Sequence, residues 1–277
     1  GECLRDARAD VRAGALASLP VLVQAGDQSF VETLVGLAGS TEGAVRQSIV
    51  EALAKVAPRH HMAAIAALLA AMEDASEYVQ GAAAESLAVV ADKGNQQAIS
   101  GVAALLASAQ ADVRSAAAAA LPRIAHRGSE MATLAVIEHL QDASSGVRLS
   151  ATNALGAIAA KGDMHAIEAL GARLEDDNAD VRRALLRCFA GIANPGNPSA
   201  VLVVSARLGH MYSDVRKAAA QTLAVVAGKE NADAVAALRA QLAAEGNAEV
   251  RKAICAALEK LGADGGGAAG GPSWAWR

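Results

Sequence analysis

The chain has 277 residues, of which 53% are hydrophobic but only 2% aromatic, which excludes a core filled by large rings. The formal net charge of −4 excludes a global electrostatic attraction for nucleic acid. Alanine is the best helix former, and β-branched runs bounded by turn residues are scarce. The composition therefore favours an all-α protein with an aliphatic, alanine-rich core.

One phrase returns along the chain at a fixed distance. A valine, in most cases followed by arginine, recurs every 34 residues, with a last step of 35. These marker valines are Val11, Val45, Val79, Val113, Val147, Val181, Val215 and Val250. A period of this length indicates stacked supersecondary units, each too small to bury its apolar face alone.

Each marker opens a predicted helix, which we name helix B. Apolar residues follow the marker after 8 and 11 positions, as Leu121 and Ile124 do in "DVRSAAAAALPRIA" at 112–125. Together with small residues at positions 4 and 7, they share one helical face. A preceding helix A carries apolar residues 14, 11 and 7 positions before the marker. Two helices in each repeat leave about 12 to 14 residues for each helix.

Turn signals separate the predicted helices. The turns from A to B are polar, whereas the turns from B to A contain glycines suited to a left-handed helix end. These glycines are Gly26, Gly94, Gly128, Gly162 and Gly196.

The two ends of the chain depart from the repeat. Residues 1–10 correspond only to the end of a helix A and its turn, so we expect a fragment of a longer chain. The array continues to residue 262. Residues 263–277 are rich in glycine and predict a disordered tail, with Trp274 and Trp276 as a docking motif in the alternative interpretation.

The three cysteines and the apolar stretches bear on location. Cys3, Cys188 and Cys255 fit neither a disulfide framework nor a zinc site, and we expect Cys188 and Cys255 to be buried thiols.

The longest wholly apolar stretch, residues 62–72, is far shorter than the ~20 residues of a membrane span. We expect a cytoplasmic protein without membrane insertion. No signal peptide is visible, but the chain begins at Gly1, so targeting stays open.

The phrases "DVRSAAAAALPRIA" and "DVRKAAAQTLAVVA" resemble the HEAT repeat, in the short form also seen in phycobilin-lyase-like proteins. Tetratricopeptide repeats share the period but need aromatic residues that this chain lacks. The resemblance covers residues 1–262. It implies a right-handed α-solenoid (an armadillo/HEAT-like superhelix) of about eight 34-residue helix pairs, with the B helices on the concave side.

The resemblance also implies a structural ladder. HEAT repeats place an aspartate six residues before the arginine of helix B, and the two form a ladder along the stack. That spacing is met by the pairs Asp6–Arg12, Asp142–Arg148 and Asp176–Arg182. Elsewhere Asp74 precedes Gln80, and Ser40, Ser108 and His210 replace the acid, so we expect an incomplete ladder. Contact of these arginines with a ligand is the alternative.

Motifs of catalysis are missing from the sequence. The six histidines share no repeat offset and no H-E-x-x-H spacing, and there is no nucleotide-binding glycine motif and no G-x-S-x-G. The HEAT-built deoxyhypusine hydroxylase uses paired His-Glu motifs for iron, whereas no histidine here precedes a glutamate. We expect no catalytic residue, no cofactor and no metal. A phycobilin-lyase-like or hydroxylase-like enzyme remains an alternative.

The outward positions of helix B, two and six residues after the marker, are the candidate contacts for a partner. They include Gln47, Glu51, Glu85, Asn153, Arg183, Arg187, Lys217, Gln221 and Lys252. The outward residues are acidic near the second and third repeats and basic from the sixth repeat onward. Arg183, Arg187 and Lys217 suggest a basic patch for an acidic segment, with an ordinary solvated face as the alternative.

The sequence therefore predicts a non-catalytic, monomeric scaffold that binds another protein or peptide on the concave helix-B face. A nucleic-acid-associated array that uses the basic C-terminal half is a further alternative. The acidic balance and the lack of stacking aromatics weigh against it, so we expect no nucleic-acid partner.

Overall fold

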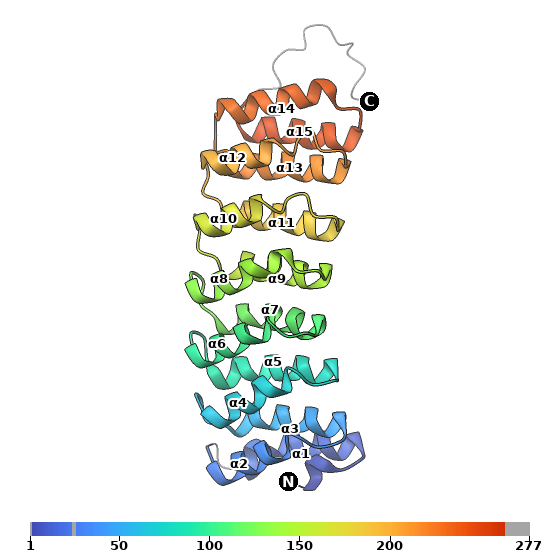
Figure 1. Ribbon diagram of the computed structural model, residues 1–277, viewed down its shortest axis with the longest axis vertical. Helices are drawn as coiled ribbons and strands as arrows, with labels where there is room; N and C mark the ends of the chain where they lie inside the picture. The colour runs from blue at the N-terminus through green and yellow to red at the C-terminus, as the bar shows by residue number, and fades with distance from the viewer. Residues whose placement is uncertain (1, 24–25, 264–277) are drawn as a thin grey trace. The chain divides into compact units, whose positions relative to one another are not determined.

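The computed structural model describes residues 2–23 and 26–263 (Figure 1). These ranges contain helices and turns but no strand, so the all-α prediction is confirmed. The residues fall into two compact units, the first ending at Ala160 and the second beginning at Lys161. Trp274 and Trp276, the candidate docking motif, lie outside the described residues.

The first unit contains five B helices, which open at or just before the marker valines within the described residues. They are α1 (Ala9–Leu22), α3 (Gly43–Val56), α5 (Glu77–Ala91), α7 (Ala111–Ile124) and α9 (Ser145–Ile158). The first B helix is preceded only by the 3-10 turn η1 (Glu2–Arg5). The A helices are α2 (Gln28–Leu37), α4 (Met62–Ala71), α6 (Gln96–Leu105) and α8 (Glu130–Glu138), the last extended by the 3-10 turn η2 (His139–Gln141).

The second unit repeats the same pairing. Its A helices are α10 (Met164–Gly171), α12 (Pro198–Ser205) and α14 (Ala232–Ala244). Its B helices are α11 (Ala179–Ile192), α13 (Ser213–Val226) and α15 (Ala248–Lys260). Within each unit, B helices pack against the B helices of neighbouring repeats and A against A (Figure 1). Each unit is thus an α-solenoid, as predicted.

The core lies between the A and B layers and between successive repeats. Marker valines Val79, Val113 and Val147 have no exposed surface, and neither have the leucines eight residues after them. The alanines four residues after these markers are also fully buried, which lets neighbouring B helices approach closely. Each buried leucine or valine contributes about 1.5–3 kcal/mol relative to an exposed one, so the stripe accounts for the stacking.

The A helices are shorter than the sequence predicted. They have 8 to 10 residues in most repeats, whereas the B helices have 13 to 15. The A helices end early because their last residues change to three-residue hydrogen bonds, as from the Leu106 amide to the Ala103 carbonyl at 3.2 Å. This tightening turns the chain toward helix B.

A regular row of backbone hydrogen bonds joins the turns from B to A. The amide of Gly94 donates to the carbonyl of Ile124 at 2.7 Å, the last residue of helix B in the next repeat. Gly26, Gly128, Gly162 and Gly196 make the equivalent bond, and the predicted glycine turns all have φ between +79° and +88°. His60 and Glu230 occupy the same position with φ of 62° and 58°, where a side chain is disfavoured.

The outermost helices expose residues that the repeat pattern predicts to be buried. Leu22 is 77% exposed, although it matches the buried Val56 and Ile124 of other repeats. Only η1 precedes α1, so no described residue covers the end of this helix. Cys255 is exposed, which makes the prediction of a buried thiol wrong, because no further B helix packs on α15 within the described residues. Cys188 is buried, as predicted, and burial raises its pKa to about 12.

No helix in the described ranges combines the length and the apolar character that crossing a bilayer requires.

Candidate functional site

In seven of the eight described B helices, an arginine in the first turn binds the turn before the helix. In each case Nη1 donates to the backbone carbonyl six residues earlier, at 2.7 to 3.1 Å. The row consists of Arg12, Arg46, Arg114, Arg148, Arg182, Arg216 and Arg251. Gln80 holds the same position and donates to the Asp74 carbonyl at 2.7 Å. The arginine row thus fixes the A-to-B turns.

The structure differs from the predicted ladder in the atoms that pair. Arg12 binds the carbonyl of Asp6, and Arg148 and Arg182 bind the carbonyls of Asp142 and Asp176. The carboxylate of Asp142 points instead toward Arg114 of the preceding repeat, and it also accepts from the Ser144 amide at 2.8 Å. Any residue type can supply the carbonyl, so Ser40, Ser108 and His210 anchor the arginine of their own repeat as well as an aspartate does.

The complete inter-repeat ion pairs are bidentate. Arg46 donates through Nε and Nη2 to Asp74 at 2.6 and 2.8 Å, and Arg114 donates to Asp142 at 2.7 and 2.8 Å. Both carboxylates are less than one-tenth exposed. The hydrogen bonds from Arg114 lower the pKa of Asp142 to about 2, and those from Arg46 lower the pKa of Asp74. We call each such pair a rung.

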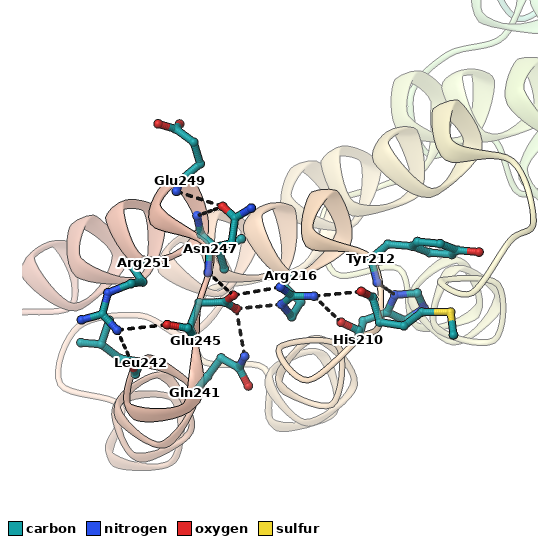
Figure 2. A network of polar contacts seen from close by, with 11 residues as sticks. His210, Tyr212, Arg216, Gln241, Leu242, Glu245, Asn247, Glu249 and Arg251 are labelled. Atoms are coloured by element: carbon teal, nitrogen blue, oxygen red, sulfur yellow. Dashed lines mark hydrogen bonds and ion pairs between the residues drawn. The ribbon is translucent and has the colours of Figure 1, made fainter.

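A glutamate makes the equivalent rung in the second unit. Arg216 donates to both carboxylate oxygens of Glu245, at 2.7 and 2.8 Å, and Gln241 and the amide of Asn247 also donate to this carboxylate (Figure 2). The Glu245 side chain is only 2% exposed. The hydrogen bonds from Arg216 lower its pKa to about 2 despite the opposing effect of burial. The sequence pattern did not single out Glu245 because the predicted ladder requires an aspartate at this position.

Arg182 lacks a rung of this kind. The position that matches Asp142 and Glu245 is held by His210, whose Nδ1 accepts from the Tyr212 amide at 3.2 Å. The ring of Tyr212 lies 4.4 Å from the guanidinium carbon of Arg182, and Asp214 approaches Nη2 at 3.6 Å. Arg182 is 5% exposed, and among the described residues no acceptor meets its Nε.

The candidate contacts of the first unit lie on the outward side of the B helices. Gln47 donates to Glu51 at 2.9 Å within α3, and Glu85 of α5 pairs with Arg123 of α7 at 3.3 Å. Asn153 is exposed on α9. These residues form a solvated polar surface that the structure does not gather into a compact site.

The basic candidates of the second unit alternate with acids. Arg183 pairs with Asp180 one turn away, and Lys217 of α13 pairs with Glu249 of α15 at 3.1 Å. The remaining candidates on these helices are exposed: Arg187, Gln221 and Lys252. Because two of its cations are paired, the predicted basic patch has less free positive charge than the sequence suggested.

Hollows in the surface gather no catalytic constellation in the described ranges. One hollow, of about 550 Å³, lies between α2 and α4 and is lined mainly by alanines, and its Arg46 and Asp74 side chains are already paired with each other. Nor do the described residues bring three His, Cys, Asp or Glu side chains close enough together to hold a metal ion.

The fold has relatives among solved structures. The crystal structure of an engineered protein aligns over 94% of this chain and 77% of its own length, at 24% identity and a TM-score of 0.52. The Escherichia coli protein YibA aligns over 94% and 90%, at 19% identity and a TM-score of 0.57. Human deoxyhypusine hydroxylase covers 94% of both chains at 19% identity, but its TM-score of 0.41 is too low to bear on function. No curated protein matches the chain in sequence.

The sequence itself matches the family model of HEAT repeats over residues 1–88 and 99–190, which together make up more than half of the chain. The chain therefore belongs to the HEAT-repeat family.

Proposed function

We propose that this protein is a non-catalytic scaffold that binds another protein or peptide through the outward side of its B helices. The observation that supports the proposal is that each B helix has a buried apolar side and an exposed polar side. The apolar stripe is fully buried, as for Val181 and Phe189 in α11, whereas Arg183 and Arg187 of the same helix are exposed. Residues in equivalent positions of successive repeats offer a partner a regular row of polar contacts.

The proposed contact region in the second unit is centred on Arg187. Arg183 and Lys217 have acidic neighbours, but these pairs are exposed and therefore weak, at about 0–1 kcal/mol each. An acidic segment of a partner can replace Asp180 and Glu249 at little cost. Arg187 is exposed, and no acid meets it among the described residues, so it is the strongest candidate for a direct ion pair.

Affinity capture with charge-reversed protein tests the proposal. The triple variant Arg183→Glu, Arg187→Glu and Lys217→Glu is compared with wild type for the proteins retained from a cell extract, and a purified partner is then titrated with both. The matched control reverses three exposed lysines in the B-to-A turns, away from this face: Lys93, Lys161 and Lys229. We expect the first variant to lose at least about tenfold in affinity, with the control close to wild type. Equal retention by both variants would refute the proposed face.

A further inference from the structure

The open rung at Arg182 marks a second surface, in the turn between α12 and α13. The three residues directly before α13 are His210, Met211 and Tyr212, whereas the three residues at the same positions of the other A-to-B turns are small, polar or charged. Met211 is 79% exposed and Tyr212 is 49% exposed. A large apolar and an aromatic side chain in a solvent-facing turn form a contact surface of the kind enriched in protein interfaces.

Beside this exposed pair lies a buried charge with an unused donor. In the complete rungs, the Nε and Nη2 groups of the arginine both donate to one carboxylate, as Arg114 does to Asp142. The Arg182 side chain is only 6% exposed, against 16% for Arg114, yet its Nε meets no acceptor among the described residues. Asp214 supplies opposite charge at 3.6 Å but lies beyond hydrogen-bond distance, and the ring of Tyr212 cannot replace a carboxylate oxygen. A buried donor without an acceptor is unfavourable, and an incoming acceptor would remove that cost.

We propose that the turn at 210–212 and Arg182 form a docking site for a partner segment that presents an apolar side chain next to a carboxylate. The apolar group packs on Met211 and Tyr212, and the carboxylate accepts from Nε and Nη2 of Arg182. The partner thereby completes the rung that His210 leaves open. Tyr212, half-exposed at the start of α13, moves aside to admit the carboxylate.

The chemistry of the site favours a carboxylate over a phosphate. A planar carboxylate matches the two parallel N–H groups of a guanidinium edge, and this is the geometry of the Arg46, Arg114 and Arg216 rungs. Asp214 stands beside Arg182, and Glu175 pairs with Arg207 next to the turn whose Asp176 carbonyl binds Arg182. These acids repel the larger charge of a phosphate more strongly.

Nuclear magnetic resonance of the arginine Nε–H groups tests the proposal directly on the full chain. The probe is N-acetylleucine, which carries an apolar side chain and a carboxylate, and the matched control is N-acetylleucine amide, which lacks the carboxylate. We expect a saturable shift of the Arg182 Nε–H signal with the acid and none with the amide. The Arg216 signal stays unchanged because its rung is already filled.

Three variants sharpen the result. His210→Asp supplies the missing carboxylate and should abolish the response. Met211→Ala should lower the affinity for N-acetylleucine by up to about tenfold, to the affinity for acetate, because the apolar contact is lost. Tyr212→Ala removes the covering ring and should bind acetate at least as well as wild type does.

The proposal is overturned if neither wild type nor Tyr212→Ala shows a saturable shift, if the shift persists in His210→Asp, or if inorganic phosphate produces as strong a response as N-acetylleucine. The readout is independent of the B-helix face, because the variant reversed at Arg183, Arg187 and Lys217 keeps this turn. Failure of one proposal is therefore distinguishable from failure of the other.

Discussion

Arg114 in the first unit and Arg182 in the second occupy the same position of the repeat but have different partners. Arg114 donates to both oxygens of Asp142, whereas Arg182 is covered by the ring of Tyr212 and has no bidentate partner among the described residues. Both arginines anchor their own turn through the carbonyl six residues earlier. The difference shows that the arginine has two separable functions: one fixes its own repeat, and the other joins it to the next.

The largest expected effect comes from breaking a complete rung. Asp142→Ala leaves the largely buried guanidinium of Arg114 without its carboxylate, and removal of one partner from a buried pair costs about 3–5 kcal/mol. Urea unfolding and hydrogen exchange of α7 and α9 amides measure the loss. The control, Asp112→Ala, removes an exposed acid from the same helix and should change stability by less than about 0.5 kcal/mol. Equal effects of the two substitutions would argue against the rung.

Acid should weaken the filled rung of the second unit in a defined pH window. The pKa of Glu245 is about 2 in the folded chain, against an ordinary value near 4.3, so the unfolded chain binds the proton more readily. The stability from this group is fully present above about pH 5 and declines as the pH falls toward 2, by about 3 kcal/mol in total. Glu245→Gln should flatten this part of the stability curve, measured by circular dichroism during unfolding. A slope unchanged in the variant would contradict the assignment.

A carboxylate at position 210 should give Arg182 the same bidentate ion pair that Arg114 makes with Asp142. His210→Asp places a carboxylate opposite Nε and Nη2 and should raise the free energy of unfolding of the second unit by about 1–2 kcal/mol. The matched control is Ser108→Asp, which faces Gln80 instead of an arginine and should give no such gain. Stabilisation of both variants to the same extent would point to an effect of the turn, not of the rung.

The smallest effect is expected at the start of the array. Ser40→Asp places an acid opposite Arg12, which has no carboxylate partner of this kind among the described residues. Arg12 is only partly buried, so the new pair should add about 0.5 kcal/mol. Thermal unfolding of the variant beside Ser108→Asp measures the gain. A gain as large as that of His210→Asp would show that burial does not set the strength of a rung.

Much of the fold could be predicted from residue spacing, because each buried position recurs in every repeat. Val113, Leu121 and Ile124 are buried as the helical face requires, and Gly94 and Gly128 adopt the expected left-handed turn. The predicted burial of Leu22 and Cys255 is wrong, because burial at the first and last helices depends on a neighbour outside the local pattern.

Less of the candidate site could be predicted. The resemblance implied a ladder of Asp142 and Arg148 along the stack but not which atoms meet. The carboxylate of Asp142 faces Arg114 of the preceding repeat, whereas its carbonyl accepts from Arg148. Two residues six apart in sequence can meet through a carbonyl or through a side chain, and only the stacking distance decides between them. For the same reason, the sequence did not reveal that Glu249 of α15 pairs with Lys217 of α13. The pair of Asp180 and Arg183 lies within one turn of α11, so its spacing alone could have indicated it.

The sequence by itself determined the helix pairs, their order and the residues of the core, because helical periodicity and the exclusion of apolar side chains from water act within every repeat. Only the tertiary structure decided which charges of different repeats meet, because such an ion pair depends on a few ångströms between atoms far apart in the sequence. That distance makes Asp142 a buried partner of Arg114 and leaves Nε of Arg182 without an acceptor among the described residues.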